Sequence, residues 1–122
     1  MEIYTDNTLP KEARLKSKLA IDRLLKNGRY GYTEGIRFCY TSGSGEDLNR
    51  IMVSVPKRNF KRAVKRNLLK RRIREAYRTQ KGLLPETGHD ILFTYTSKEV
   101  LDSARIAASV ADVLRKIAAA AK

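Results

Sequence analysis

Hydrophobic residues recur along the chain at spacings that change from one segment to the next, and the first clear period is helical. Three apolar residues fall at i, i+3 and i+4: Ile21, Leu24 and Leu25. Ser17 before them is a suitable N-cap, and Asn27-Gly28 after them is a typical helix stop. The pattern therefore predicts a short helix over about residues 17–27.

The next segments alternate apolar and polar side chains, which is the period of a half-buried strand. After a Gly- and Tyr-rich connector over 29–35, the alternation runs through 36–41 and returns over 51–55, where Pro56 ends it. The Gly- and Ser-rich stretch between the two strands, 42–47, predicts a flexible hairpin loop. An antiparallel pair of strands is the economical interpretation.

The segment 61–80 is free of Gly and Pro and rich in Arg, Lys, Leu and Ala, so it predicts a long helix, with Asn59 or its neighbour as the cap. At about 100° per residue, a polar set gathers within one third of the circumference: Asn67, Lys70, Arg71, Arg74 and Arg78. A separate arc is apolar: Leu69, Ile73 and Ala76. The helix is expected to turn one face to a core and the other to an anionic partner.

The rest of the chain completes a single predicted domain of 122 residues. After a loop over 81–88, alternation over 89–96 predicts another strand. Helical spacing after Asp102, a suitable N-cap, predicts a last helix. Residues 1–16 show no sustained period and predict an extended N-terminal arm with two possible anchors, Leu9 and Leu15. The expected order is helix, two or three strands, basic helix, strand and helix.

Positive charge is concentrated in one stretch. The chain holds 26 Lys and Arg against 13 Asp and Glu, a formal net charge of +13. Between Lys57 and Lys81 there are 12 bases and one acid, Glu75, so this stretch carries +11 and the rest of the chain +2. Such local basicity indicates a polyanionic partner, because phosphates relieve the repulsion between bases and release counterions on contact.

Nucleic acid is the favoured polyanion. A basic helix on a membrane surface is disfavoured, because this one lacks Trp, has no Phe after Phe60 and lies between predicted strands. Three aromatic residues of the strands offer faces on which bases could stack, or else they pack in the core: Phe38, Tyr40 and Tyr95.

No residue pattern indicates catalysis by the protein itself. The acids are scattered, His89 is the only histidine, and paired metal-ligand spacings are missing. We expect His89 to be structural and Cys39 to be an inert buried residue. A lone cysteine supplies neither a disulfide nor a zinc site, so a cytoplasmic protein is expected, with no membrane association and no cofactor of its own.

Residues 63–78 read AVKRNLLKRRIREAYR, and they match every fixed position of the pattern A-V-x-R-N-x-x-K-R-x-x-R-x-x-[FY]. This pattern is the signature of the bacterial ribonuclease P protein family, which the chain resembles over nearly its whole length. Four flanking stretches also resemble the family: 11–15, 21–28, 54–57 and 84–93.

The resemblance implies an α/β fold, an α+β sandwich like domain 2 of ribosomal protein S5, with the order α-β-β-β-α-β-α and a left-handed βαβ crossover. It also implies a protein subunit of ribonuclease P that binds the catalytic RNA subunit and precursor tRNA and requires no protein partner. In that enzyme the RNA and its divalent metal ions, Mg²⁺, perform the 5′ cleavage, so no catalytic residue is expected here. The residues leave one alternative open, a non-catalytic structural RNA-binding protein such as a ribosomal protein or assembly factor.

Carried over position by position, the resemblance implies two RNA-binding sets. The RNA-subunit set is Arg66, Asn67, Lys70, Arg71 and Arg74, with flanking Lys57, Arg58, Arg62 and Lys65 as supporting phosphate contacts. The 5′-leader set is Ile21 and Leu25, where the family has Phe, and Tyr40, whose place Cys39 would take after a one-residue slip.

Overall fold

The structure is a computed structural model, and it describes residues 14, 15, 17–44 and 48–120. Its elements, in chain order, are α2 (Lys18–Asn27), β1 (Arg29–Thr33), β2 (Ile36–Thr41), β3 (Arg50–Ser54), α3 (Ala63–Gln80), η2 (Lys81–Leu83), β4 (Asp90–Tyr95) and α4 (Ser103–Ala120). Apart from the short 3₁₀ helix η2, this is the order α-β-β-β-α-β-α that the family resemblance implies.

The four strands form one mixed sheet in the order β1-β2-β4-β3. Strands β1 and β2 pair antiparallel, β2 and β4 pair antiparallel, and β3 and β4 pair parallel. The predicted hairpin of 36–41 with 51–55 is therefore wrong, because β4 lies between these two strands. The predicted hairpin loop over 42–47 thus does not join neighbouring strands, and its residues 45–47 lie outside the described part of the chain.

Polar contacts join the beginnings of β3 and β4 and favour the position of β4 between β2 and β3. Arg50 makes a bidentate ion pair with Asp90, at 2.8 and 2.9 Å, and these two residues are also partners in the strand register. Just before them, the Asn49 Oδ1 accepts the His89 backbone N–H at 2.9 Å and lies 3.0 Å from His89 Nδ1. Since Asn49, His89 and Asp90 are all buried, these bonds satisfy polar groups that would otherwise be costly.

Strand β1 occupies the segment predicted as a connector. Its inward-facing positions include Gly31, which pairs with Phe38 of β2. A Cβ on Gly31 would come within 2.4 Å of the Phe38 ring, so the ring occupies the space that a side chain would need. The apolar pattern does not predict this strand, because its core-facing side has no large apolar residue of its own.

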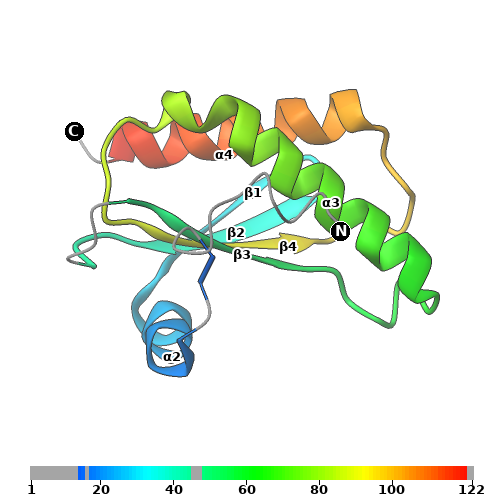
Figure 1. The fold of residues 1–122 in the computed structure, drawn as a ribbon, viewed down its shortest axis with the longest axis horizontal. Helices are drawn as coiled ribbons and strands as arrows, with labels where there is room; N and C mark the ends of the chain where they lie inside the picture. The colour runs from blue at the N-terminus through cyan, green and yellow to red at the C-terminus, as the bar shows by residue number, and fades with distance from the viewer. Residues whose placement is uncertain (1–13, 16, 45–47, 121–122) are drawn as a thin grey trace, which may run out of the picture.

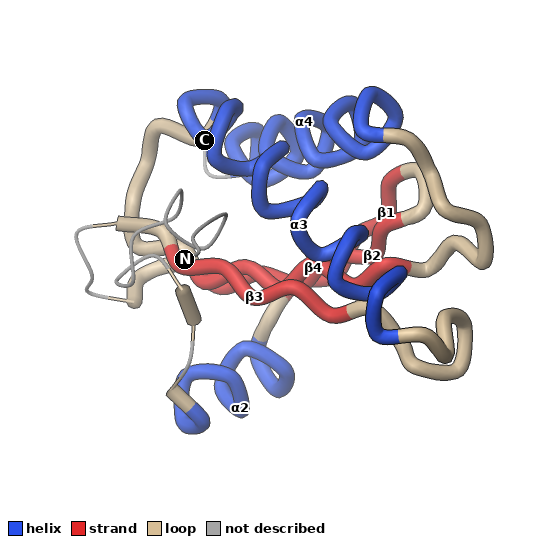
Figure 2. Tube along the Cα trace, turned by 45° about the vertical axis from the view of Figure 1, so that its right-hand side comes forward, coloured by secondary structure: helices blue, strands red, loops and turns tan. Residues whose placement is uncertain are grey.

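Helices cover both faces of the sheet. Figure 1 shows α3 and α4 side by side on one face and α2 on the other, and the turned view of Figure 2 shows the same layers. The main hydrophobic core lies under α3 and α4. A smaller cluster lies under α2 and consists of Leu15, Ala20, Leu24 and Cys39. Helix α3 makes the crossover between the parallel strands β3 and β4, and its handedness stays a prediction of the resemblance.

The ends of the elements follow local chemistry. The Ser17 hydroxyl caps α2 by accepting the Ala20 N–H at 3.3 Å, and Asp102 Oδ1 accepts the Arg105 N–H at 2.8 Å at the start of α4, so both predicted caps are confirmed. The cap predicted at Asn59 is wrong, because α3 begins two residues later than 61 and has Arg62 as its N-cap, without a side-chain hydrogen bond.

The N-terminal arm is described only at its end. Leu15 is buried, and its N–H donates to the Ile51 carbonyl at 2.8 Å, which confirms it as an anchor. The other predicted anchor, Leu9, lies outside the described residues.

Candidate nucleic-acid interface

Helix α3 separates its apolar and basic side chains as the helical spacing predicts. Its buried residues are Leu69, Ile73, Ala76 and Tyr77, which pack in the main core. On the outward side, Asn67 and Arg71 are exposed, while Lys70 and Arg74 are half-buried. We call the surface formed by Asn67, Lys70, Arg71 and Arg74 the basic face.

Most bases of the stretch 57–81 lack an anionic partner in the described part of the chain. Arg78 pairs with Glu75, and its hydrogen bond lowers the pKa of that carboxyl group, so the acid is committed to one base. Arg66 and Arg72 donate to backbone carbonyls. For the other nine, the side chain makes no hydrogen bond or ion pair among the described residues: Lys57, Arg58, Lys61, Arg62, Lys65, Lys70, Arg71, Arg74 and Lys81. Their mutual repulsion favours binding of a polyanion.

Arg66 has a structural role that its place in the signature does not reveal. Its Nη1 donates to the Phe60 carbonyl at 2.7 Å and to the Lys61 carbonyl at 2.8 Å. Phe60 is buried, with its ring edge-on to Tyr95 at a centroid distance of 5.7 Å. Arg66 therefore fixes the turn at the start of α3, and its RNA contact stays a prediction.

A basic hollow of about 400 Å³ lies beside the first turn of α3. Lys61, Arg62 and Lys65 line it from the α3 side, and Lys98 joins them from the loop after β4. No carboxylate is among its lining residues, which also include Asn59, Phe60 and Val100. The predicted phosphate contacts Arg62 and Lys65 therefore share this hollow, and Lys98 is an addition that no local pattern indicates, because only the fold brings it there.

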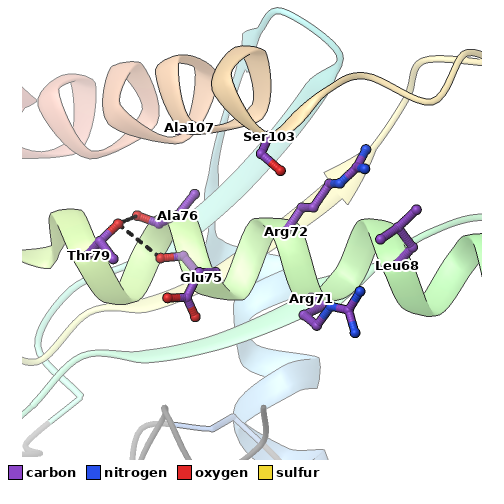
Figure 3. A pocket seen from close by; sticks show the side chains of 8 residues that line it. All are labelled: Leu68, Arg71, Arg72, Glu75, Ala76, Thr79, Ser103 and Ala107. Atoms are coloured by element: carbon purple, nitrogen blue, oxygen red, sulfur yellow. Dashed lines mark hydrogen bonds between the residues drawn. The ribbon is translucent and has the colours of Figure 1, made fainter. Parts of the chain in front are cut away.

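A larger groove of about 510 Å³ separates α3 from α4. Figure 3 shows Arg72 pointing toward α4 and Arg71 turned to the other side of α3. Arg72 Nη1 donates to the Leu101 carbonyl at 2.7 Å, so this base ties the two helices together. The groove borders the basic face, because Arg71 also lines it, and its lining includes Glu75 and apolar side chains.

The predicted leader residues do not all lie on one side of the sheet. Ile21 is half-buried and Leu25 is 46% exposed, both on α2. Tyr40 faces the main core, where it is only 8% exposed and its ring lies 6.3 Å from both the Phe38 and His89 rings. Alternation along β2 turns Tyr40 to the face opposite Cys39, but at the end of the strand it lines a hollow of about 390 Å³ with Arg23 and Asn27 of α2. Its role in leader binding stays a prediction.

The neighbouring Cys39 does face α2, yet it is covered. Its side chain is 1% exposed, and its Sγ lies 3.3 Å from the Leu24 carbonyl. The prediction of an inert buried cysteine agrees with this placement. Phe38 and Tyr95 are likewise buried in the main core, so none of the three aromatic residues considered for base stacking presents a free ring face.

Two other tyrosines lie on the α2 side of the sheet. Tyr30 and Tyr32 of β1 are 52% and 66% exposed. The guanidinium carbon of Arg37 lies 5.8 Å from the centre of the Tyr30 ring, and the Tyr30 hydroxyl donates to the Leu25 carbonyl at 3.2 Å. The spacing Tyr-Gly-Tyr has the alternation of a strand and is the sequence signal for these two exposed rings, although the composition of 29–35 predicts a connector.

The described residues contain no group of three or more His, Cys, Asp or Glu side chains placed to hold a metal ion. His89 is buried against Asn49, as expected of a structural histidine. In the same described portion, every helix is too short or too polar to cross a membrane.

Comparison with known proteins adds an independent line of evidence. A family model described as Ribonuclease P matches residues 9–118. A ribonuclease P protein component from Borrelia turicatae (strain 91E135) is 38% identical over 86 residues, which cover 70% of this chain and 74% of that protein. Another from Porphyromonas gingivalis (strain ATCC BAA-308 / W83) is 33% identical over 118 residues, covering 90% and 86%.

Solved structures show the same architecture. The RNase P protein from Thermotoga maritima superposes with a TM-score of 0.74 at 25% identity, covering 84% of this chain and 96% of that one. The Staphylococcus aureus RNase P protein gives a TM-score of 0.73 at 25% identity, with 87% and 94% covered.

Proposed function

Because this chain belongs to the ribonuclease P protein component family, which forms part of a tRNA-processing endoribonuclease, we propose that it binds the catalytic RNA subunit through the basic face of α3. The observation that carries this proposal is the set of nine bases around α3 that have no partner among the described residues. Their number and their position outside the core match what a phosphate backbone requires.

The positive charge of α3 is the first feature that favours RNA binding. Lys70, Arg71 and Arg74 project from a helix that is held rigidly by Leu69 and Ile73, so their charged groups are presented together. Asn67, in the same face, adds an uncharged donor and acceptor for a base edge or ribose. The hollow with Arg62, Lys65 and Lys98 extends the positive surface past the start of α3.

The second RNA contact proposed here is with the 5′ leader of precursor tRNA, on the α2 side of the sheet. Ile21 and Leu25 are accessible there and offer apolar contact to unpaired nucleotides. Tyr40, the third residue of this proposed contact, packs mainly in the core and lines a hollow with Arg23 and Asn27 of α2 at the end of β2. The two RNA-binding surfaces therefore lie on opposite sides of the sheet, with α3 on one side and α2 on the other.

In this proposal the RNA subunit and its Mg²⁺ ions carry out the hydrolysis, and the protein contributes positioning and charge. The bases of α3 lower the repulsion between RNA strands, which reduces the number of Mg²⁺ ions that the complex needs. No side chain of the protein is assigned to the reacting phosphate.

The test is a 5′ maturation assay at low Mg²⁺ with the full chain, its cognate RNA subunit and precursor tRNA. We expect faster cleavage than with RNA alone, and loss of most of the gain with the double variant Lys70→Ala/Arg74→Ala. Arg115→Ala, on the exposed side of α4, is the control and should keep the gain. RNA binding without any gain in cleavage would instead favour a structural RNA-binding protein.

A further inference from the structure

Small side chains line the groove between α3 and α4, where the two helices lie side by side (Figure 1). Ala76 of α3 and Ala107 of α4 are among the lining residues of this space of about 510 Å³. Larger residues of both helices, such as Tyr77 and Val110, are buried in the main core and set the distance between the helices. Cavities of roughly 300–1,000 Å³ are typical of small-molecule sites. The groove is therefore large enough for an organic ligand.

Two hydrogen bonds hold the groove at a fixed width. Arg72 Nη1 donates to the Leu101 carbonyl at 2.7 Å, just before α4 begins, and Gln80 Nε2 donates to the Ala107 carbonyl at 2.9 Å. Arg72 and Gln80 are two turns of α3 apart, which corresponds to about 12 Å along the helix axis. Because α3 is tied to the segment of α4 at both places, the groove is preformed, and a ligand requires little ordering of the protein.

The two ends of the groove differ in chemistry. Figure 3 shows Arg71 and Arg72 toward the end that is nearer the start of α3, and Ala76 and Thr79 toward the other end. The Thr79 hydroxyl donates to the carbonyls of Glu75 and Ala76 in its own helix, at 3.0 and 3.3 Å. The end with Ala76 and Thr79 therefore presents mainly apolar surface to a ligand, and we call it the apolar end.

The opposite end of the groove has unused hydrogen-bond donors. Arg71 is exposed, and neither its guanidinium nor Nε and Nη2 of Arg72 has a partner among the described residues. The hydroxyl of Ser103, the first residue of α4, likewise makes no hydrogen bond within the described part of the chain. Among the lining residues that the structure describes, Glu75 is the only acid, and it is paired with Arg78. This end therefore suits an anionic group.

We propose that this groove binds a small amphipathic anion, with an apolar body between Ala76 and Ala107 and a carboxylate, sulfonate or phosphate on Arg71 and Arg72. An RNA strand does not suit the apolar end, because the side chains of Ala76 and Ala107 offer no partner for ribose or phosphate oxygens. Since Arg71 also belongs to the basic face, the bound anion competes with the RNA subunit for this guanidinium. The competition rests on the proposed function, and it is reciprocal, because each ligand weakens the other by the same factor.

The first experiment measures the binding of two fluorescent probes to the full chain without RNA. Anilinonaphthalene sulfonate has an apolar ring system and one anionic group, and phenylnaphthylamine has the same rings without the sulfonate. We expect the anionic probe to bind about tenfold more tightly, because hydrogen bonds to a charged group contribute that order of affinity. Arg71→Ala should remove most of this difference and leave the affinity for the neutral probe unchanged.

A groove-filling variant and its matched control locate the probes. Ala107→Leu places a larger side chain in the lining of the groove and should weaken the binding of both probes at least tenfold. Ala108→Leu makes the same change at the next position of α4, which is exposed and outside the lining, and should keep both wild-type affinities. Thermal unfolding checks that each variant is folded. If Ala107→Leu does not fold, the comparison of the two probes on Arg71→Ala decides.

The second experiment measures affinity for the cognate RNA subunit with and without saturating anilinonaphthalene sulfonate. The wild type is expected to lose affinity by about fivefold in the presence of the probe, a typical size for coupling between two ligands. The Ala107→Leu chain should bind RNA like the wild type without the probe and should lose nothing when the probe is added.

Equal affinity of the wild type for the two probes would overturn the proposal, and so would unchanged probe binding by a folded Ala107→Leu chain or an unchanged RNA affinity at saturating probe. Weaker RNA binding by Ala107→Leu without the probe would show that RNA itself occupies the groove, and self-association that this variant abolishes would assign the groove to a second copy; either result also overturns it. If the protein gives no gain in 5′ maturation, the proposed function fails while the probe titrations without RNA still decide the groove.

Discussion

Arg66 shows how one residue of the signature serves both the fold and the site. Its guanidinium bridges two carbonyls, of Phe60 and Lys61, in the turn that leads into α3. The first turn of this helix has no acidic residue and no side-chain cap. The turn therefore depends on a base that reaches back from the helix, whereas Lys70 and Arg74 are free to bind RNA.

Arg66→Ala is expected to lower the free energy of unfolding by about 1–2 kcal/mol, because hydrogen bonds to charged groups are lost and two carbonyls remain unpaired. It should also weaken RNA binding, since the start of α3 loses its fixed position. Arg71→Ala, which removes an exposed base, should weaken RNA binding only. Chemical denaturation and RNA affinity measured on both variants check this, and equal stability of the two would contradict it.

Cys39 is a second residue whose position decides its chemistry. Burial raises the pKa of its thiol, and the side chain lies beneath α2 next to Leu24. The adjoining Gly28 is required by close approach, because a Cβ there would lie 2.3 Å from Sγ. A thiol in such a place reacts only when α2 moves away.

The native thiol is therefore expected to react with a disulfide reagent far more slowly than the unfolded chain. Leu24→Ala leaves a cavity in a small cluster and weakens the contact of α2 with the sheet, so it should speed the reaction at least tenfold. The measurement is the rate of thiol modification at neutral pH without denaturant. A native rate close to that of the chain in urea would show that α2 does not cover Cys39.

At the scale of elements, α3 acts as a rigid support for charge. Its buried side is held by the sheet and by α4, so its bases keep their spacing when RNA binds. Each base that contacts a phosphate releases counterions, and this makes the affinity depend on salt. The slope of log affinity against log salt concentration therefore reports the number of phosphate contacts.

We expect Lys70→Ala, Arg74→Ala and Lys98→Ala each to lower that slope by about one unit for the RNA subunit. Lys98 is included because it shares the hollow beside α3. The control is Arg115→Ala, a base of α4 that is exposed and pairs with Asp112 at 3.3 Å. Binding isotherms at several salt concentrations give the slopes. The interface would be placed wrongly if the three variants kept the wild-type slope.

For the whole molecule, the distribution of charge matters more than its total. A charge of +11 lies within 57–81, and three of the described acids elsewhere are engaged in the ion pairs Arg50–Asp90, Arg105–Glu34 and Arg115–Asp112. The free protein therefore holds unrelieved repulsion around α3, which a bound anion removes.

Sulfate or a short RNA is thus expected to raise the melting temperature of the free chain by several degrees, well above the effect of chloride at equal ionic strength. The rise should be smaller in Lys70→Ala/Arg74→Ala, which carries two fewer bases on the basic face. Thermal unfolding followed by circular dichroism measures both. The same increase in the wild type and the double variant would place the anion elsewhere.

The sequence by itself determined the elements with a strong local period and the chemistry of α3. Spacing of three to four residues predicts α2 and α4, helix propensity predicts α3, and alternation predicts β2, β3 and β4. The angular position of each base on α3 follows from helix geometry alone. These features depend on neighbours within a few residues, which is why they are readable without the fold.

The tertiary structure decided which strands are neighbours and which side chains meet. Strand β4 separates β2 from β3 through the pairing of Arg50 with Asp90, residues 40 apart in the chain. Tyr40 packs in the main core, whereas Tyr30 and Tyr32 lie on the α2 side of the sheet. The reason is that a shift of one residue along a strand reverses the face. Lys98 lines the same hollow as the bases at the start of α3, and the Arg66 guanidinium donates to two backbone carbonyls. Each of these outcomes depends on surfaces that are distant in sequence and become complementary only when the sheet and helices pack together.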